Sequence, residues 1–341
     1  MLVPMPVPAE VPRNIARNAV FMKDREGKRG NNFDDILFLV NRNGFPVENE
    51  TWEMMWEFAM LQYPHKKDVI NSIRYSEELK QQTSPVAPSM VNGNGNAVNP
   101  WDFTIAVQDY MEKLQYNHTG TQFFEIKKNK SMASLMETAK AMMRESLPIK
   151  CLESVVLGIC LTNGLPNLER FPINFKTRFC ERSYYHVVLG IYYGGVYGAL
   201  GLSRRADLMY KPLVYKSLSD MVFDYVYCYK RYEHRVVKLT IGHYVPHNPK
   251  VNDSINWKGL CLHLNQMIEE QARKETDKYA RVLRSGNMHG PIVLPPKGLI
   301  SHLGRSVPQK AESYDDISAM AISSEYHRGV QCHGNYTRRG V

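Results

Sequence analysis

The stretch SYYHVVLGIYYGGVYGALGLS, residues 183–203, contains two runs of β-branched and aromatic residues separated by the glycine pair 194–195. Two adjacent glycines between such runs predict a two-residue β-hairpin turn, because this turn needs positive φ angles at both positions. Counting outward from the turn places His186 opposite Ser203, where facing Cβ atoms lie about 5 Å apart. A bulge would change this register, and His186 could equally be a surface residue of a strand.

Outside this hairpin, the spacing of apolar residues predicts both helices and strands. Helices are expected over residues 50–63, 68–79, 101–114, 131–146, 152–162 and 255–284, and strands over residues 171–179 and 237–244. Residues 83–100, TSPVAPSMVNGNGNAVNP, are dense in turn-forming residues and predict a linker or a long surface loop. This pattern is typical of an α+β fold with an antiparallel sheet.

The composition favours a globular protein with an anionic partner. The 341 residues are 43% hydrophobic, and the net charge of +9 favours nucleic acid, an anionic membrane surface or an acidic protein tail as partner. No nucleic-acid-binding motif is recognisable, so we expect no nucleic-acid partner. The six cysteines form no CxxC pair, which argues against a metal site and a disulfide framework.

The sequence also argues against membrane insertion and classical secretion. The longest uncharged apolar run, residues 187–203, contains five glycines and belongs to the expected hairpin, so no transmembrane helix and no stable membrane insertion are expected. The first 14 residues, MLVPMPVPAEVPRN, are interrupted by prolines and lack the basic region that opens a usual signal peptide.

Cys151 is a candidate nucleophile, because it follows Lys150 and directly precedes a predicted helix. Free N–H groups at a helix N-terminus and a neighbouring positive charge both stabilise a thiolate. A cysteine in an apolar context is nevertheless more often an inert core residue. His186, with Ser203 as its orienting neighbour, would supply the base that an activated thiol needs.

Four blocks of this sequence closely resemble the vasohibin family, and the resemblance extends from about residue 38 to about residue 280. The blocks are LQYNHTGTQFFEIKK (114–128), LPIKCLE (147–153), LERFPINFK (168–176) and YGALGLSRRADLMYKP (197–212). Vasohibins are transglutaminase-like cysteine peptidases that remove the C-terminal tyrosine of α-tubulin. The resemblance therefore implies this fold, with an antiparallel sheet packed on the nucleophile helix, and this activity.

The resemblance also assigns roles to residues. Cys151 matches the family nucleophile, His186 the base and Ser203 the third member, which orients the histidine by its hydroxyl or by nearby backbone. Tyr116 matches a tyrosine that helps to bind the reacting carbonyl oxygen. Lys150 and Arg204 match the residues that hold the terminal carboxylate, as a forked guanidinium does bidentately. Basic residues that could gather the acidic tubulin tail are Lys127, Lys128, Lys176, Arg178 and Arg205; each of them could equally be an ordinary surface charge.

Family members work with a short helical activator, the small vasohibin-binding protein. The resemblance therefore implies three partners: this activator, the α-tubulin tail and microtubules. We expect no cofactor. Candidate contacts are Trp52, Trp56, Met60 and Trp101, which could instead fill the core.

We expect a disordered segment over 1–30, a helical N-terminal lobe over 31–125, a catalytic lobe over 126–290 and a flexible tail over 291–341. The expected location is the cytoplasm, at the cytoskeleton.

Two other functions stay open at this point. The same thiol and imidazole would support a transglutaminase-type acyltransferase. A secreted protein that regulates vessel growth by binding is also compatible with the resemblance, through unconventional export.

Overall fold

The computed structural model describes residues 19–21, 37–77, 83–91, 93, 95–119, 121–286 and 292–293. Its helices are α2 (Asn49–Gln62), α3 (Lys67–Arg74), α4 (Pro100–Leu114), α5 (Met132–Glu145), α6 (Cys151–Leu161), α7 (Leu218–Arg231) and α8 (Glu269–Ser285), with short 3₁₀ turns η1 (Pro64–Lys66), η2 (Ala206–Leu208) and η3 (Leu264–Gln266). Its strands are β1 (Ala19–Phe21), β2 (Leu37–Leu39), β3 (Glu169–Phe179), β4 (Arg182–Tyr193), β5 (Val196–Leu200), β6 (Lys211–Tyr215), β7 (Arg235–Ile241), β8 (Leu260–Leu262) and β9 (Ile292–Val293). The predicted disordered start and tail fall largely outside the described residues.

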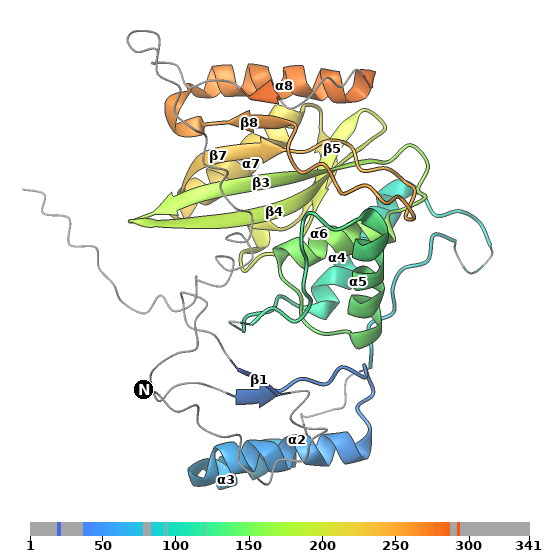
Figure 1. The fold of residues 1–341 in the computed structure, drawn as a ribbon, viewed down its shortest axis with the longest axis vertical. Helices are drawn as coiled ribbons and strands as arrows, with labels where there is room; N and C mark the ends of the chain where they lie inside the picture. The colour runs from blue at the N-terminus through green and yellow to red at the C-terminus, as the bar shows by residue number, and fades with distance from the viewer. Residues whose placement is uncertain are drawn as a thin grey trace, which may run out of the picture.

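A seven-stranded sheet in the order β6-β5-β4-β3-β7-β8-β9 forms the centre of the molecule. Its strands pair antiparallel except at the β8–β9 edge, which is parallel. Helices α4, α5 and α6 cover one face, while α7 and α8 cover the other (Figure 1). The predicted α+β class with an antiparallel sheet is confirmed.

The central strands β3 and β4 separate two hydrophobic clusters. Along β4, Val187 and Leu189 face the cluster that contains Cys151 and helices α4 to α6, whereas Val188 faces the cluster of α7 and α8. This alternation follows from the two-residue repeat of a strand, and both faces are apolar because both are covered. We call these clusters the α6-side core and the α7-side core.

The hairpin prediction is correct at the turn. Gly194 and Gly195 have φ angles of +58° and +88°, and Tyr193 pairs with Val196 as the two-residue turn requires. The β4–β5 pairing nevertheless ends at Leu189↔Leu200. His186 and Ser203 are therefore not a strand pair, because the chain leaves the sheet after β5.

Helix α6, which carries Cys151, is almost entirely buried. It follows α5, whose first turn is capped by the Ser131 hydroxyl accepting from Ser134 N at 3.3 Å. Helix α6 packs on β4 and on α5, and its C-terminal half is held by Arg170. The predicted helices 131–146 and 152–162 correspond to α5 and α6.

The predicted long helix over 255–284 is wrong in its first half. Residues 260–262 form β8, which pairs with β7, and the helix begins only at Glu269. Local spacing did not reveal this break, because β8 exists through hydrogen bonds to a distant strand. At Gly259 the Tyr279 side chain approaches so closely that a Cβ atom would lie 1.7 Å from its hydroxyl oxygen.

Helix α4 packs in the α6-side core, through buried residues such as Phe103, Val107 and Met111. The predicted division at residue 125 therefore falls between two helices that share one core, and the division into lobes stays a prediction. Helices α2 and α3 lie apart from the sheet, at the lower end of Figure 1. Within the described residues, no helix is long and apolar enough to cross a membrane, and no cluster of metal-binding side chains occurs.

Candidate functional site

Cys151 is the first residue of α6, at the end where the helix presents free N–H groups to the sulfur. The backbone N–H groups of Val187 and Leu152 donate to the sulfur, and Lys128 brings a positive charge near it. Burial outweighs these contacts and raises the pKa of the thiol, since the side chain is only 6% exposed. In the resting protein the thiol is therefore neutral.

His186 lies on β4, next to the residue whose N–H meets the sulfur. Its Nε2 is 2.8 Å from the carbonyl oxygen of Leu208. A carbonyl can only accept, so Nε2 carries the proton and Nδ1 keeps its lone pair. Burial lowers the pKa of His186 to about 4, which keeps the ring neutral and available as a base.

The predicted contact between His186 and the Ser203 hydroxyl is replaced by this carbonyl. Ser203 Oγ accepts instead from Arg205 N, at 3.4 Å. The reason is the early end of the β4–β5 ladder, after which residues 206–208 form the turn η2 and bring the Leu208 carbonyl to the ring. Of the two ways of orienting the histidine, the described contacts favour nearby backbone.

Tyr116 is placed near Cys151 by backbone pairing. It forms a parallel bridge with Ile149, in which Asn117 N donates to Ile149 O at 2.9 Å. The Arg204 guanidinium lies over the Tyr116 ring, 5.6 Å from its centroid. Two of the predicted residues, 88 positions apart in the chain, therefore meet beside the start of α6.

Lys150 is 2% exposed and belongs to the same corner. Its Nζ donates to the Thr119 carbonyl at 3.0 Å, and its backbone N–H donates to Glu153 Oε2. Glu153 is fully buried and also accepts from Phe124 N at 3.1 Å, and burial raises its pKa to about 7. Glu153, which the sequence did not single out, thus joins the nucleophile helix to the segment after Tyr116.

The other predicted basic residues differ in their contacts. Lys128 donates to Asn174 at 3.0 Å, and its charge acts on Cys151. Burial lowers the pKa of Lys128 to about 8. Lys176 lies over the Tyr185 ring and Arg205 over the Tyr232 ring, at 5.3 and 4.8 Å.

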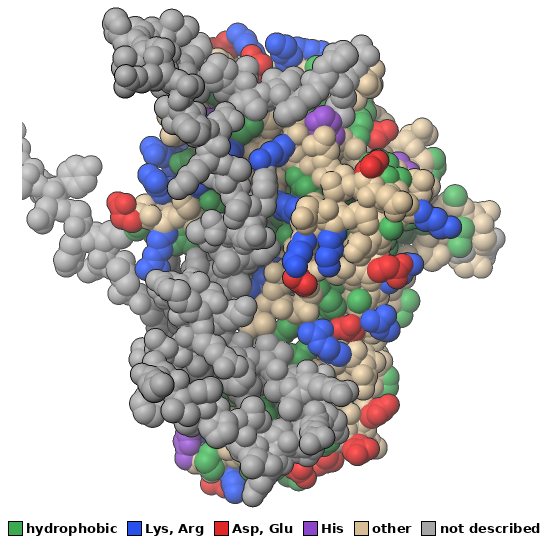
Figure 2. Space-filling view, viewed as in Figure 1, with side chains coloured by type: hydrophobic (Ala, Val, Ile, Leu, Met, Phe, Trp, Pro, Cys, Tyr) green, Lys and Arg blue, Asp and Glu red, His purple; other side chains and the backbone are tan. Residues whose placement is uncertain are grey.

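Strands β3 and β7 place like charges opposite each other. Lys176 pairs with Lys238, and Arg178 pairs with Arg235. Facing like charges destabilise a sheet. Because an anionic ligand would reduce the repulsion between these pairs, the surface formed by β3 and β7 is suited to such a ligand. Figure 2 shows lysine and arginine side chains spread over the part of the face that carries the sheet, whereas acidic side chains gather along the lower edge.

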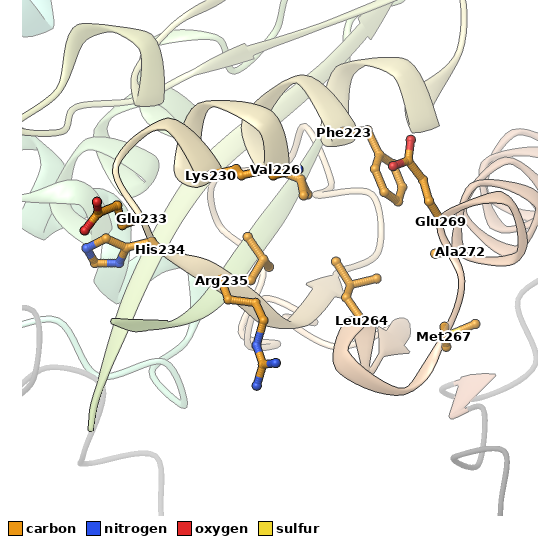
Figure 3. A pocket seen from close by; sticks show the side chains of 11 residues that line it. Phe223, Val226, Lys230, Glu233, His234, Arg235, Leu264, Met267, Glu269 and Ala272 are labelled. Atoms are coloured by element: carbon orange, nitrogen blue, oxygen red, sulfur yellow. The ribbon is translucent and has the colours of Figure 1, made fainter. Parts of the chain in front are cut away.

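A cavity of about 420 Å³ lies elsewhere, between α7, β7 and the start of α8 (Figure 3). Its apolar wall includes Phe223, Val226 and Leu264, with Lys230 and Arg235 at the rim. None of the residues predicted for the site lines this cavity. It is therefore separate from the thiol and the imidazole.

Two comparisons with known proteins found relatives of this chain. The model of the vasohibin family matches residues 36–284, which include Cys151, His186 and Tyr116. The chain is also 43% identical, over 293 residues, to tubulinyl-Tyr carboxypeptidase 1 of Mus musculus, an alignment that covers 85% of this chain and 76% of the mouse protein.

Proposed function

The chain belongs to the vasohibin family, and from this premise we propose that it removes the C-terminal tyrosine of α-tubulin, with Cys151 as nucleophile and His186 as base. The observation that carries the residue assignment is the hydrogen bond between His186 Nε2 and the Leu208 carbonyl. This hydrogen bond leaves Nδ1 of His186 as the basic atom. The next residue on β4, Val187, donates its backbone N–H to the Cys151 sulfur.

The reaction follows from a neutral thiol beside a neutral imidazole. His186 Nδ1 takes the thiol proton while the sulfur attacks the carbonyl carbon of the last peptide bond. The tetrahedral intermediate then breaks its C–N bond, and the imidazolium returns the proton to the leaving amino group of tyrosine. Water, deprotonated by His186, hydrolyses the remaining thioester and regenerates the thiol.

Tyr116, Lys150 and Arg204 bind the substrate end in this proposal. The Tyr116 hydroxyl donates to the oxygen that becomes negative in the intermediate, a contribution that is typically worth about 3 kcal/mol. Arg204, which lies over the Tyr116 ring, binds the free α-carboxylate that a carboxypeptidase must recognise. Lys150 adds a second positive charge from the residue before the nucleophile.

The basic residues around the site suit the glutamate-rich tail of tubulin. The charge of Lys128 acts on the thiol, and Lys176 and Arg205, which lie over tyrosine rings, add further positive charges. An acidic segment bound along β3 and β7 would relieve the repulsion between the facing like-charged pairs on these two strands. A tubulin substrate also implies that the protein acts at the cytoskeleton.

The experiment that tests this function is mass spectrometry of tubulin tails after treatment with wild type and with Cys151→Ala. Wild type should release free tyrosine and leave tails that are one residue shorter, and Cys151→Ala should leave them intact. The matched control is Cys160→Ala, because Cys160 lies on the same helix at its other end. Intact tyrosine after wild-type treatment, with the helical partner present, would overturn the assignment.

We also propose that α2 and α3 bind the small helical activator of the family. Leu61 on α2 and Val69 and Ile73 on α3 are aliphatic side chains that are 61%, 57% and 50% exposed, and exposed apolar side chains that lie together mark interaction sites. Trp52 and Trp56 pack edge-to-face on α2. Trp101, a further candidate contact, packs instead on Tyr193 and donates to the Leu213 carbonyl at 3.2 Å.

Val69→Asp is expected to abolish co-purification of the activator, because a charge in an apolar contact is costly. Val214→Asp is the matched control, since Val214 is similarly exposed (62%) but lies on β6. The measurement is pull-down of the tagged activator after co-expression. Equal recovery with both variants would exclude this surface.

A further inference from the structure

Tyr229 of α7 buries a hydroxyl group that has no hydrogen-bond partner among the described residues. The side chain is 5% exposed, and its ring packs on Phe175 at 5.6 Å and against the edge of His186 at 6.5 Å. One turn earlier on the same helix, the Tyr225 hydroxyl donates to the Met209 carbonyl at 2.7 Å. This face of α7 therefore supports the His186 ring, both directly and through the 208–209 segment that carries its carbonyl partner.

The position of the Tyr229 hydroxyl distinguishes it from other buried hydroxyls. Tyr110 and Tyr244 also lack a partner among the described residues, but no charge at the thiol acts on them. For Tyr229, the groups whose charge bears on the hydroxyl include Cys151 and Tyr116. Burial raises the pKa of Tyr229 well above 10, so the group keeps its proton and stays a donor.

Packing does not explain why this residue is a tyrosine. A phenylalanine would keep both ring contacts and would avoid burying an unpartnered hydroxyl, which costs free energy. A donor that is buried but unsatisfied in the resting protein is expected where charge develops during a reaction, because it is then already oriented.

We propose that Tyr229 is a further catalytic residue, whose hydroxyl donates a hydrogen bond to the reacting carbonyl oxygen when this oxygen becomes negative. This inference rests on the proposed function and adds a second phenol to Tyr116. The two hydroxyls come from different parts of the fold, Tyr116 from the bridge before α6 and Tyr229 from α7. The oxygen is thereby held between the two helical layers.

The test is Tyr229→Phe, measured with a peptide that ends in Glu-Tyr and with the helical activator present. Loss of one such donor typically lowers kcat by about 100- to 1,000-fold, and KM should change little because the donor acts in the transition state. The melting temperature should not fall, since the variant removes an unsatisfied group. Tyr244→Phe removes a similarly unpartnered hydroxyl away from the thiol and should keep wild-type kcat.

Two measurements separate this proposal from its alternatives. Alkylation of Cys151 by iodoacetamide in the absence of substrate should proceed equally in wild type and Tyr229→Phe; a slower reaction in the variant would show that the hydroxyl acts on the thiol and would overturn the proposal. Wild-type kcat in Tyr229→Phe would overturn it as well. If wild type itself released no tyrosine, the proposed function would fail first, so the two failures are distinguishable.

Discussion

Replacing His186 by glutamine is expected to lower kcat by about 1,000-fold or more, while the protein remains folded. The glutamine amide can still donate to the Leu208 carbonyl, which lies 2.8 Å from Nε2 in the structure. It has no basic nitrogen, so the Cys151 thiol keeps its proton and cannot attack. Loss of one member of a nucleophile–base pair typically removes most of the catalysis that the pair supplies.

His247 provides a matched control for this experiment. Its Nε2 lies 2.8 Å from the Leu168 carbonyl, the same contact in a part of the molecule away from the thiol. His247→Gln should therefore retain wild-type kcat for tyrosine release. If His186→Gln also retained it, another group would have to be the base.

The pH profile of the wild-type enzyme gives a second measure of His186. Because the pKa of this ring in the free protein is lowered to about 4, the base stays neutral, and kcat/KM should fall only as the pH approaches 4. An ordinary imidazole would lose activity near pH 6.5. The same pKa shift affects the free energy of unfolding, because the unfolded chain binds a proton at His186 at a higher pH than the folded protein does. The contribution of His186 to stability is therefore fully present above the ordinary pKa of about 6.5 and is lost as the pH falls toward 4. A half-maximal kcat/KM near pH 6.5 would contradict the buried, neutral ring.

The second large effect is expected on stability, from Arg170→Met. Arg170 is fully buried and donates to the carbonyls of Ile159, Val245 and Pro246, each at 3.0 Å. Methionine fills a similar volume but leaves these backbone acceptors without their donor. We expect a loss of about 3–5 kcal/mol in the free energy of unfolding, measured by urea denaturation.

Arg144→Met is the control for this substitution. Arg144 lies on α5 with its side chain 68% exposed, and arginine and methionine have similar helix propensities. The expected change is within about 0.5 kcal/mol, as is usual at exposed positions. Equal effects of the two substitutions would mean that Arg170 does not anchor α6.

The part of the fold that follows from local chemistry could be predicted. The glycine pair 194–195 determines a turn of positive φ, and the apolar spacing before and after Pro148 indicates α5 and α6. Strand β8 and helix α7 were missed. Residues 260–262 form a strand only because β7 lies beside them, and α7 mixes aromatic and charged residues on a helix that is covered by the sheet.

The candidate site divides in the same way. Cys151, His186 and Tyr116 carry recognisable side chains, so their sequence context points to them. The Leu208 carbonyl does not, because every residue has a carbonyl, and only the three-dimensional turn of residues 206–208 selects this one. Tyr229 and Glu153 were missed because their role depends on burial beside the thiol and at the start of α6, which a single sequence does not display.

The separation of the molecule into two cores has a consequence for how activity is lost. Cys151, the proposed nucleophile, belongs to the α6-side core, whereas Tyr229, which packs against the proposed base His186, belongs to the α7-side core. The Cys151 thiol and the Tyr229 ring that packs against His186 therefore belong to different cores, and the alignment of the proposed nucleophile and base depends on how both cores pack against the sheet. A small shift of one core relative to the other would abolish activity while both cores remain folded. Activity is therefore more sensitive to such a shift than the melting temperature is.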